Sequence, residues 1–348
     1  MYKKYIKRLL DIVLSSIAII VFFPIIIVIG ILVGADLGFP IIFKQKRVGK
    51  GEKEFDLYKF RTMSNKTNGN GALLSDKNRV TKLGSFLRNY SLDELPELIN
   101  ILKGDMSIVG PRPLLVRYKN FYTNNEKIRH SVRPGLTGVA QVHGRNLDLW
   151  DIRLKLDAEY VQNITFKQDM KIIFQTVFMV LTKKGVVIRD ESLIKDLDEE
   201  RKDKIEIHEL TLEEIKVNKN KIAFYIEKLE EIAGIKNESN RVWNNIIKYK
   251  KNKSAKIYGA FDFEKNIIGF IWFYKLKDKI HINYFYIDER YRRCGIGKKL
   301  IKEAYKYGKK VGIDKIDLNV YMRNINAINF YEKQGFKCEE RINLCKKI

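Results

Sequence analysis

Two adjacent carboxylates, Asp93 and Glu94, stand in the segment SLDELPEL, from Ser91 to Leu98, of a chain with 66 Lys and Arg against 42 Asp and Glu. A structural interpretation exists, because Ser91 followed by Glu94 matches a capping box. Pro96 argues against a helix capped at Ser91, since proline belongs in the first turn. A helix that begins near Asp93 would place both carboxylates at the positive end of its dipole, which favours their ionised form. They would then be ready to coordinate a cation or attack an electrophile, and both interpretations stay open here.

Five arginines lie near the acid pair in sequence, and several of them stand in turns shaped by Gly or Pro. Guanidinium groups suit phosphate oxygens, and turn amides add further donors. Each arginine alone is explained equally well as a solvated surface charge. Together with the carboxylates they indicate chemistry on a phosphate. Arg88 and Arg112 are the main predicted phosphate ligands, followed by Arg61, Arg133 and Arg145.

An uncharged segment from Ile12 to Ala35 is long enough to cross a bilayer. Lysines and arginines flank it closely at both ends, so the positive-inside rule draws both ends toward the cytoplasm. A re-entrant membrane helix over about residues 9–35 satisfies this rule, and Pro24 supplies the bend. A plain spanning helix is the alternative. We expect a monotopic protein on the cytoplasmic face of the membrane.

The chain has 348 residues, enough for two domains with separate cores. Asp190 to Lys204 is dense in charge, which predicts a linker between domains at 1–189 and 205–348. Three cysteines without paired spacing argue for a reducing compartment. Lys171 to Lys184 has an uncharged core too short to span a bilayer, and we expect this helix to pack on its domain rather than lie at the membrane surface.

A glycine turn, RRCGIGK, follows the predicted strand IHINYFYI and opens a helix near Gly297. Backbone amides at such a helix start form an anion site, although the spacing alone also occurs in ordinary turns. The order of strands and helices after residue 204 predicts an α/β domain with a mixed sheet. The fold class expected for the whole chain is therefore α/β, with a re-entrant membrane helix and a small α/β catalytic domain first.

The N-terminal segments together resemble the monotopic phosphoglycosyl transferases of bacterial glycoconjugate assembly, over about Tyr5 to Leu181. The matching segments are KRLLD, the apolar hairpin, FKQKRVG, KFRTM, SLDELPELINILKGDMSIVGPRP and RPGLTGVAQV. The resemblance implies transfer of a sugar phosphate from a UDP-sugar to polyprenol (undecaprenyl) phosphate, with release of UMP, at the bacterial inner membrane. It also implies that Asp93 is a nucleophile that forms an aspartyl-phosphosugar intermediate, and that Glu94 and Asp93 hold Mg²⁺. Phe23 departs from the small polar residue that often precedes the hairpin proline.

The glycine turn and the downstream segment LNVYMRNINAINFYEKQGF resemble the GCN5-related N-acetyltransferases (GNAT), over about Lys204 to Ile348. The resemblance implies that acetyl-CoA is a co-substrate, that Asn324 contacts it, and that Tyr331 protonates the departing thiolate. Without the motif, Tyr331 reads as a packed aromatic beside Phe330. The residues implied to hold the cofactor around its pyrophosphate are Arg292, Arg293, Cys294, Gly295, Ile296, Gly297 and Lys298.

The sequence thus predicts a bifunctional enzyme that N-acetylates a UDP-amino-sugar and loads the sugar phosphate onto polyprenol phosphate. The alternative keeps the phosphoglycosyl transferase and makes the GNAT-like domain a non-catalytic binding or regulatory module. A third hypothesis, a membrane-tethered nucleic-acid binder, explains the formal charge of +24. Nothing resembles a recognition helix or a stacking platform, so no nucleic-acid partner is expected. A homodimer is left open.

Overall fold

The chain folds into two compact units in a computed structural model, Met1–Glu199 and Glu200–Ile348. The structure describes residues 1–143, 149–182, 195–234 and 239–338. The division lies within 190–204, the segment predicted to be a linker. Part of that segment is helical, since α8 spans Leu197–Asp203, and Leu197 and Arg201 are buried.

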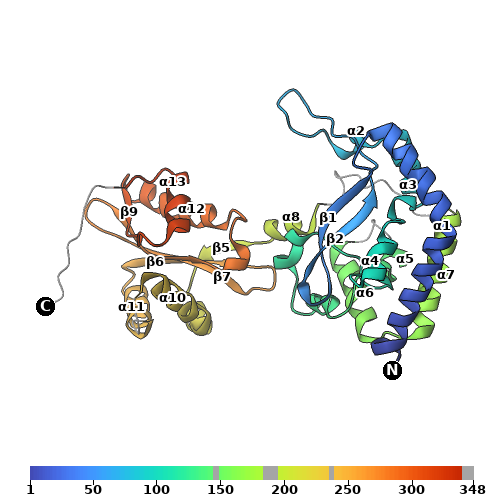
Figure 1. The fold of residues 1–348 in the computed structure, drawn as a ribbon. Coiled ribbons are helices and arrows are strands. Elements are labelled where there is room, and N and C mark those ends of the chain that lie inside the picture. The colour runs from blue at the N-terminus through green and yellow to red at the C-terminus, as the bar shows by residue number, and fades with distance from the viewer. Residues whose placement is uncertain (144–148, 183–194, 235–238, 339–348) are drawn as a thin grey trace. The chain divides into compact units, whose positions relative to one another are not determined.

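A long apolar helix, α1 (Lys7–Leu37), opens the first unit after a single π-type turn, η1 (Tyr2–Ile6). Within the described residues it is the one helix long and apolar enough to cross a membrane. Pro24 lies inside it and does not divide it into two helices, and Figure 1 shows one curved rod alongside the unit. The predicted re-entrant path through the membrane therefore stays a prediction.

Both halves of α1 are fixed to the same unit. Near its start, Arg8 donates to the last carbonyls of α4 at 2.6 and 2.8 Å, which satisfies groups that a helix end leaves open. Asp11 accepts from the Ser107 hydroxyl and from the next backbone amide, both at 2.9 Å. Near its end, Ile29 and Val33 are buried in a cluster with side chains of β2 and α3. Both halves of α1 therefore contact the same folded unit.

Two small sheets support the first unit. The strands β1 (Ile42–Val48) and β2 (Glu54–Phe60) form an antiparallel pair joined by η2 (Lys50–Glu52). The strands β3 (Ser107–Val109) and β4 (Gly135–Thr137) pair in parallel. The remaining helical elements are α2 (Asp76–Arg79), α3 (Lys82–Asn89), η3 (Leu92–Glu94), α4 (Glu97–Lys103), η4 (Val116–Phe121), η5 (Glu126–Ser131), α5 (Val139–His143), α6 (Trp150–Gln162) and α7 (Phe166–Thr182).

The helix α7 packs on its domain with one face, as expected. Asp169 and Ile172 are buried along it, and Ile172 lies in a buried cluster with Val109. Its other face is open, since Phe174 and Leu181 are 73% and 75% exposed. Asp169 joins the helix to the N-terminus, because Tyr2 and Lys7 both contact its carboxylate at 2.6 Å. The helix therefore has one face against its unit and one exposed apolar face.

The second unit is a five-stranded sheet in the order β5-β6-β7-β8-β9. The first three pairings are antiparallel and β8 pairs with β9 in parallel, so the sheet is mixed as predicted. The strands are β5 (Glu206–Glu209), β6 (Ala255–Phe261), β7 (Ile267–Lys275), β8 (Ile280–Ile287) and β9 (Ile316–Leu318).

Helices cover both faces of this sheet, as Figure 1 shows. One buried cluster joins the sheet to α12 (Ile296–Lys310) and α13 (Ile325–Lys333). The other joins it to α10 (Lys219–Ala233) and α11 (Ser239–Lys251). The shorter α9 (Leu212–Val217) and η6 (Glu289–Tyr291) complete the unit.

The parallel pairing at one edge of the sheet is short. The strand β9 pairs with β8 only at residues 280–282. The rest of β8 therefore has no strand beside it on that side among the described residues, and it leads directly into the glycine turn. No further strand follows β9 up to Cys338, and residues 339–348 lie outside the described part.

Candidate active sites

The acid pair lies on η3, a single 3₁₀ turn between α3 and α4. Ser91 has a φ of 55° and makes no side-chain cap, so the capping-box interpretation is wrong. Pro96 is the N-cap of α4, which begins at Glu97. The turn therefore presents Asp93 and Glu94 just before a regular helix.

Lys59, at the end of β2, makes a shorter ion pair with Glu94 than Arg112 does, and no motif in the sequence indicated it. Its Nζ lies 2.6 Å from Glu94 Oε1 and 3.1 Å from Glu97 Oε1. Arg112 adds a longer contact of 3.5 Å to the same Glu94 oxygen. Strand alternation offered a signal for Lys59, because it shares a face with the buried Phe55 and Leu57. A charge at a position predicted to be buried requires a partner.

The two neighbouring carboxyls differ in their pKa. Burial opposes ionisation of Glu94, but Lys59 and Arg112 outweigh it and lower the pKa of Glu94 to about 2. Burial, and next the charge of Glu94, raise the pKa of Asp93 above its ordinary value. The expectation that the helix end favours ionisation of both is therefore wrong for Asp93. Burial also raises the pKa of Glu97 to about 7.

Two of the predicted phosphate ligands, Arg88 and Arg112, flank the pair. Arg88 Nε donates to Thr62 Oγ1 at 2.9 Å. Arg112 is held through its backbone, because its carbonyl accepts from Arg129 at 2.7 Å. Arg129 is itself buried and pairs with the buried Asp157 at 2.7 Å. An internal ion pair that the sequence did not reveal thus fixes the turn that carries Arg112.

The remaining predicted phosphate ligands have different surroundings. Arg61 lines the same cavity as the acid pair, and its guanidinium also donates to the backbone carbonyls of Gly38 and Pro40. Arg133 does not line that cavity; it donates to the Gly104 carbonyl at 2.7 Å. Arg145 lies outside the described residues.

A cavity of about 1210 Å³ contains the acid pair. Its wall joins residues of β2, α3, η3 and the turn after β3 to residues of α6 and α7. Besides the carboxylates it carries Lys59, Arg88 and Arg112. The wall therefore surrounds the acid pair with positive charge, which suits a polyanionic ligand.

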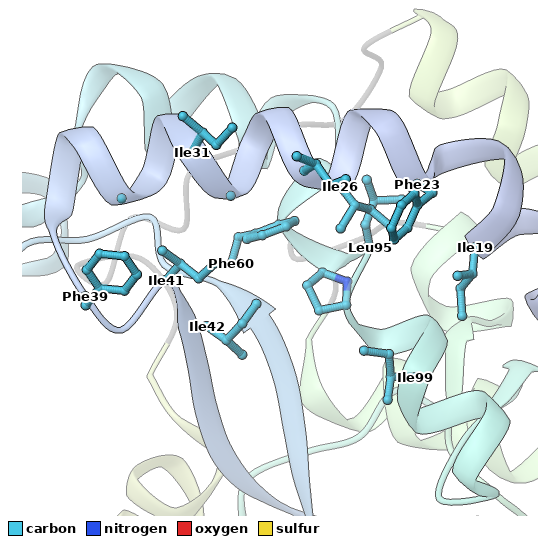
Figure 2. Close-up of a pocket in the computed structure, with 14 residues that line it drawn as sticks. Ile19, Phe23, Ile26, Ile31, Phe39, Ile41, Ile42, Phe60, Leu95 and Ile99 are labelled. Carbon is cyan, nitrogen blue, oxygen red and sulfur yellow. The ribbon is translucent and has the colours of Figure 1, made fainter.

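A second cavity of about 680 Å³ adjoins the first and is almost wholly apolar. Figure 2 shows its side chains on α1, on the start of β1, and on the segment that follows the acid pair. Leu95 and Phe60 line both cavities. Gly30 and Gly34 of α1 also line it, as does Phe23, the residue that departs from the family pattern. The acid pair thus lies where a cationic cavity meets an apolar one.

The two carboxylates suit a magnesium ion whose remaining ligands come from substrate phosphates and water. No group of three or more acidic, His or Cys side chains that could hold a metal exists in the described residues. Mg²⁺ often takes only one or two carboxylates and completes its octahedron with water and phosphate oxygens. Glu94 remains ionised, and both of its ion pairs use Oε1, which leaves Oε2 as the carboxylate oxygen for a cation.

The predicted cofactor turn of the second unit has the backbone of an anion site. Arg293 and Gly295 have φ angles of 62° and 81°, and Gly295 is the N-cap of α12. A Cβ on Gly297 would lie 2.9 Å from the Phe330 ring, so this position excludes any side chain. The first-turn amides of α12, from Ile296 to Lys298, lie at a helix start, the kind of position that can bind an anion.

The side chains of the turn have local roles. Arg292 donates to the Ile287 carbonyl at 3.2 Å. Cys294 Sγ lies 3.5 Å from the Arg292 carbonyl. Asn324, expected to contact the cofactor, caps α13 by accepting from the Ala327 amide at 3.2 Å. The backbone, more than these side chains, shapes the predicted cofactor site.

Tyr331 lies on α13 and is 9% exposed. Its ring packs among Phe285, Phe330 and Phe336. Burial raises the pKa of its hydroxyl above the ordinary value, so the group keeps its proton at neutral pH. A neutral phenol is the form that a general acid requires.

Candidates for the amine-proton acceptor have other partners. Asp288 caps η6, and its pKa is about 2 because Arg290 outweighs the effect of burial. Glu289 pairs with Arg292 at 3.4 Å. His281 contacts Asp317 at 2.8 Å. None of these contacts assigns the base.

The two units carry two different candidate transferase sites, so the chain is a two-part transferase. The family model described as bacterial sugar transferase matches residues 2–183, over half of the chain, and the chain belongs to this family. The model of the acetyltransferase (GNAT) family matches residues 237–336. Both resemblances noted in the sequence are thereby confirmed.

Curated relatives match the first unit. The uncharacterized sugar transferase EpsL of Bacillus subtilis is 45% identical over 52% of this chain and 90% of its own. A UDP-N-acetylgalactosamine-undecaprenyl-phosphate N-acetylgalactosaminephosphotransferase of Aeromonas hydrophila is 38% identical over 52% of this chain and 45% of its own. A UDP-glucose:undecaprenyl-phosphate glucose-1-phosphate transferase of Klebsiella pneumoniae is 41% identical over 49% of this chain and 39% of its own. The chain thus spans less than half the length of the latter two relatives.

Solved structures match the second unit. An acetyltransferase of the GNAT family from Staphylococcus aureus is 26% identical with a TM-score of 0.36, over 40% of this chain and 89% of that one. The PaiA N-acetyltransferase of Thermoplasma acidophilum, in complex with coenzyme A, is 29% identical with a TM-score of 0.34, over 40% of this chain and 92% of that one.

Proposed function

We propose that the first unit transfers a sugar phosphate from a UDP-sugar to polyprenol phosphate, and that the second unit N-acetylates the UDP-amino-sugar that precedes it. One observation carries the first part. The acid pair lies between a cationic cavity and an apolar one, with Leu95 and Phe60 in both walls. Such a junction suits a reaction that joins a water-soluble diphosphate to a lipid phosphate.

In the first half-reaction, a carboxylate oxygen of Asp93 attacks the phosphorus that bears the sugar. The bond from that phosphorus to the bridging oxygen breaks, and UMP departs with the electron pair. In the second, a phosphate oxygen of the polyprenol phosphate attacks the same phosphorus and Asp93 leaves. Arg88 and Arg112 neutralise the phosphate oxygens during both steps. Covalent capture spares the site from holding both anionic substrates together.

A magnesium ion held by Glu94 and Asp93 would neutralise phosphate charge during the displacement. Its other ligands would be substrate phosphate oxygens and water. Lys59 holds Glu94 by one oxygen and thereby orients the other. In this role Glu94 is a ligand, and Asp93 supplies the nucleophilic oxygen.

The membrane supplies the lipid acceptor, and both apolar helices suit that surface. The exposed side chains of α1 include Ile20, Val21 and Ile31, which are 73%, 62% and 67% exposed, and α7 adds Phe174 and Leu181. Because both ends of α1 are bound to the first unit, the helix enters and leaves on one face. The protein is then monotopic on the cytoplasmic face, and the 680 Å³ apolar cavity receives the isoprenoid chain.

In the second unit, the amides of the glycine turn hold the pyrophosphate of acetyl-CoA. The end of β8 that β9 leaves uncovered lies beside the pantetheine arm. The substrate amine attacks the thioester carbonyl and gives up a proton, while Tyr331 donates one to the departing thiolate. Acetylation removes a positive charge from the sugar. A cavity lined by Lys59, Arg88 and Arg112 repels an ammonium group, so the first unit accepts product in preference to precursor.

The test uses the full-length protein in lipid nanodiscs with Mg²⁺, polyprenol phosphate and a panel of UDP-sugars that differ at the amino position. UMP release and the lipid-linked product are measured with and without acetyl-CoA. Asp93→Asn should abolish UMP release, whereas Asp314→Asn, an exposed site on the second unit, should leave it unchanged. Mass spectrometry of wild-type protein without lipid acceptor should show the glycosyl phosphate adduct.

Two results would count against the proposal. UMP release that survives in Asp93→Asn removes the nucleophile. Acetyl-CoA binding without turnover of any UDP-amino-sugar makes the second unit a regulatory module instead.

A further inference from the structure

Lys59 forms ion pairs with two carboxylates of the same short segment, Glu94 and Glu97. Its Nζ lies 2.6 Å from Glu94 and 3.1 Å from Glu97. The side chain of Glu97 is 4% exposed, against 18% for Glu94 and 19% for Lys59. Glu97 is therefore the deeper of the two partners, and Glu94 is the one that reaches the cavity.

The proposed metal site creates a problem of charge. Glu94 Oε1 already receives both Lys59 and Arg112. A divalent cation on the same carboxylate lies within a few ångströms of the Lys59 ammonium, and like charges at such range repel strongly in a partly buried site. Lys59 therefore competes with a metal for Glu94.

Glu97 is an alternative ion-pair partner that Lys59 can use without a change in the backbone. It is the first residue of α4, and its carboxylate forms an ion pair with Lys59. Arg47 and Arg112 act on it electrostatically. A move of the ammonium from Glu94 toward Glu97 keeps the lysine paired and buried. It also places the positive charge farther from the carboxylate that the cation uses.

We propose that Glu97 is a positioning residue that takes over Lys59 when a divalent cation binds Glu94. This inference rests on the proposed function, because it requires Glu94 to be a metal ligand. In the metal-free protein the Lys59 ammonium neutralises the acid pair. In the metal-bound protein the same ammonium pairs with Glu97 instead. Glu97 thus acts on metal affinity through Lys59 and does not touch the substrate.

The test measures Mn²⁺ affinity of the full-length protein by electron paramagnetic resonance at pH 8, above the pKa of about 7 for Glu97. Glu97→Gln should weaken Mn²⁺ binding by about tenfold or more, the effect of losing one charged contact. Lys59→Gln should tighten binding, because the competitor is gone. In the double variant, Glu97→Gln should have no further effect, since Glu97 then has no lysine to hold.

A second variant distinguishes the direct contact of Glu97 with Lys59 from a long-range effect of the Glu97 charge, even if Lys59→Gln does not fold. Glu97→Asp keeps the negative charge but withdraws it by one methylene from Lys59. Our inference predicts that it too weakens Mn²⁺ binding, whereas a remote charge predicts wild-type affinity. Equal losses from Glu97→Gln with and without Lys59, or no loss from either Glu97 variant, would overturn the inference.

Glu94→Gln distinguishes this inference from the proposed function. If it removes Mn²⁺ binding while the Glu97 variants bind normally, the metal site stands and the inference fails. If Glu94→Gln binds Mn²⁺ like the wild type, the metal assignment fails, and the inference fails with it.

Discussion

The two units build their candidate sites from different parts of the chain. In the first, the chemistry lies in charged side chains drawn from β2, η3, α4 and the turn after β3, and several of them are largely buried. In the second, the predicted pyrophosphate site lies in the backbone of one continuous turn, with φ angles of 62° at Arg293 and 81° at Gly295, and one side chain, Tyr331, has a proposed chemical step. A substitution in the first site should therefore affect the other residues of that site through electrostatics. A substitution in the second should act through the local backbone conformation.

The largest effect that tests this contrast is expected at Tyr331, the one side chain of the second unit with a proposed chemical step. Tyr331→Phe keeps the packed ring but removes the proton donor, so acetyl transfer should fall by roughly 100- to 10,000-fold. Binding of acetyl-CoA, measured by calorimetry, should be unchanged. An active Tyr331→Phe enzyme would show that the thiolate is protonated by another group.

In the first unit a change outside the acid pair should also be severe. Asp157→Asn leaves the Arg129 charge buried without its partner, at a cost of about 3–5 kcal/mol. Unfolding of the intact chain by urea, followed by tryptophan fluorescence, should show earlier loss of the first unit. Acetyl-CoA binding should persist at the same urea concentration. Loss of both together would mean that the units unfold as one.

The pH profile of UMP release should report the nucleophile. Burial raises the pKa of Asp93 above 3.8, and attack requires the ionised form. The activity should therefore fall on acidification with an apparent pKa above 3.8, whereas a limb governed by Glu94 would lie near 2. An acid limb in kcat/KM at or below 3.8 would contradict the assignment of Asp93.

The smallest effect is expected from alanine substitutions at a matched pair of glycines in the second unit. Gly295 and Gly312 have φ angles of 81° and 71°, and an added Cβ meets nothing within 4 Å at either. Alanine at each should cost about 1–3 kcal/mol of unfolding free energy through backbone strain alone. Only Gly295→Ala should also weaken acetyl-CoA binding, measured by calorimetry. Equal weakening by Gly312→Ala would show that stability, not the turn, controls binding.

Much of the second unit followed from local sequence. Alternating strands and the glycine turn were predictable because each depends on neighbours in the chain. The helical segment from Leu212 to Ala233 is divided at Asn218 into α9 and α10. Asn324 caps a helix, a role that its position before INAINF also allowed.

The first unit was harder to predict because its contacts are distant in sequence. Arg88 and Arg112 were found from residue type, but the ion pair of Arg129 and Asp157 joins residues 28 apart. Lys59 and Glu94 are 35 residues apart, so no spacing rule relates them. The sequence could not decide how much of α7 its unit covers, because an apolar stripe looks the same whether protein or lipid covers it.

The attachment of α1 has a practical consequence for protein production. Removing residues 1–37 to obtain a water-soluble fragment would also delete Arg8 and Asp11. The terminal carbonyls of α4 and the Ser107 hydroxyl would lose the partners they have at 2.6 to 2.9 Å. The anchor is a structural part of the catalytic body, so an anchorless truncation should misfold, and detergent or lipid has to accompany the intact chain through purification.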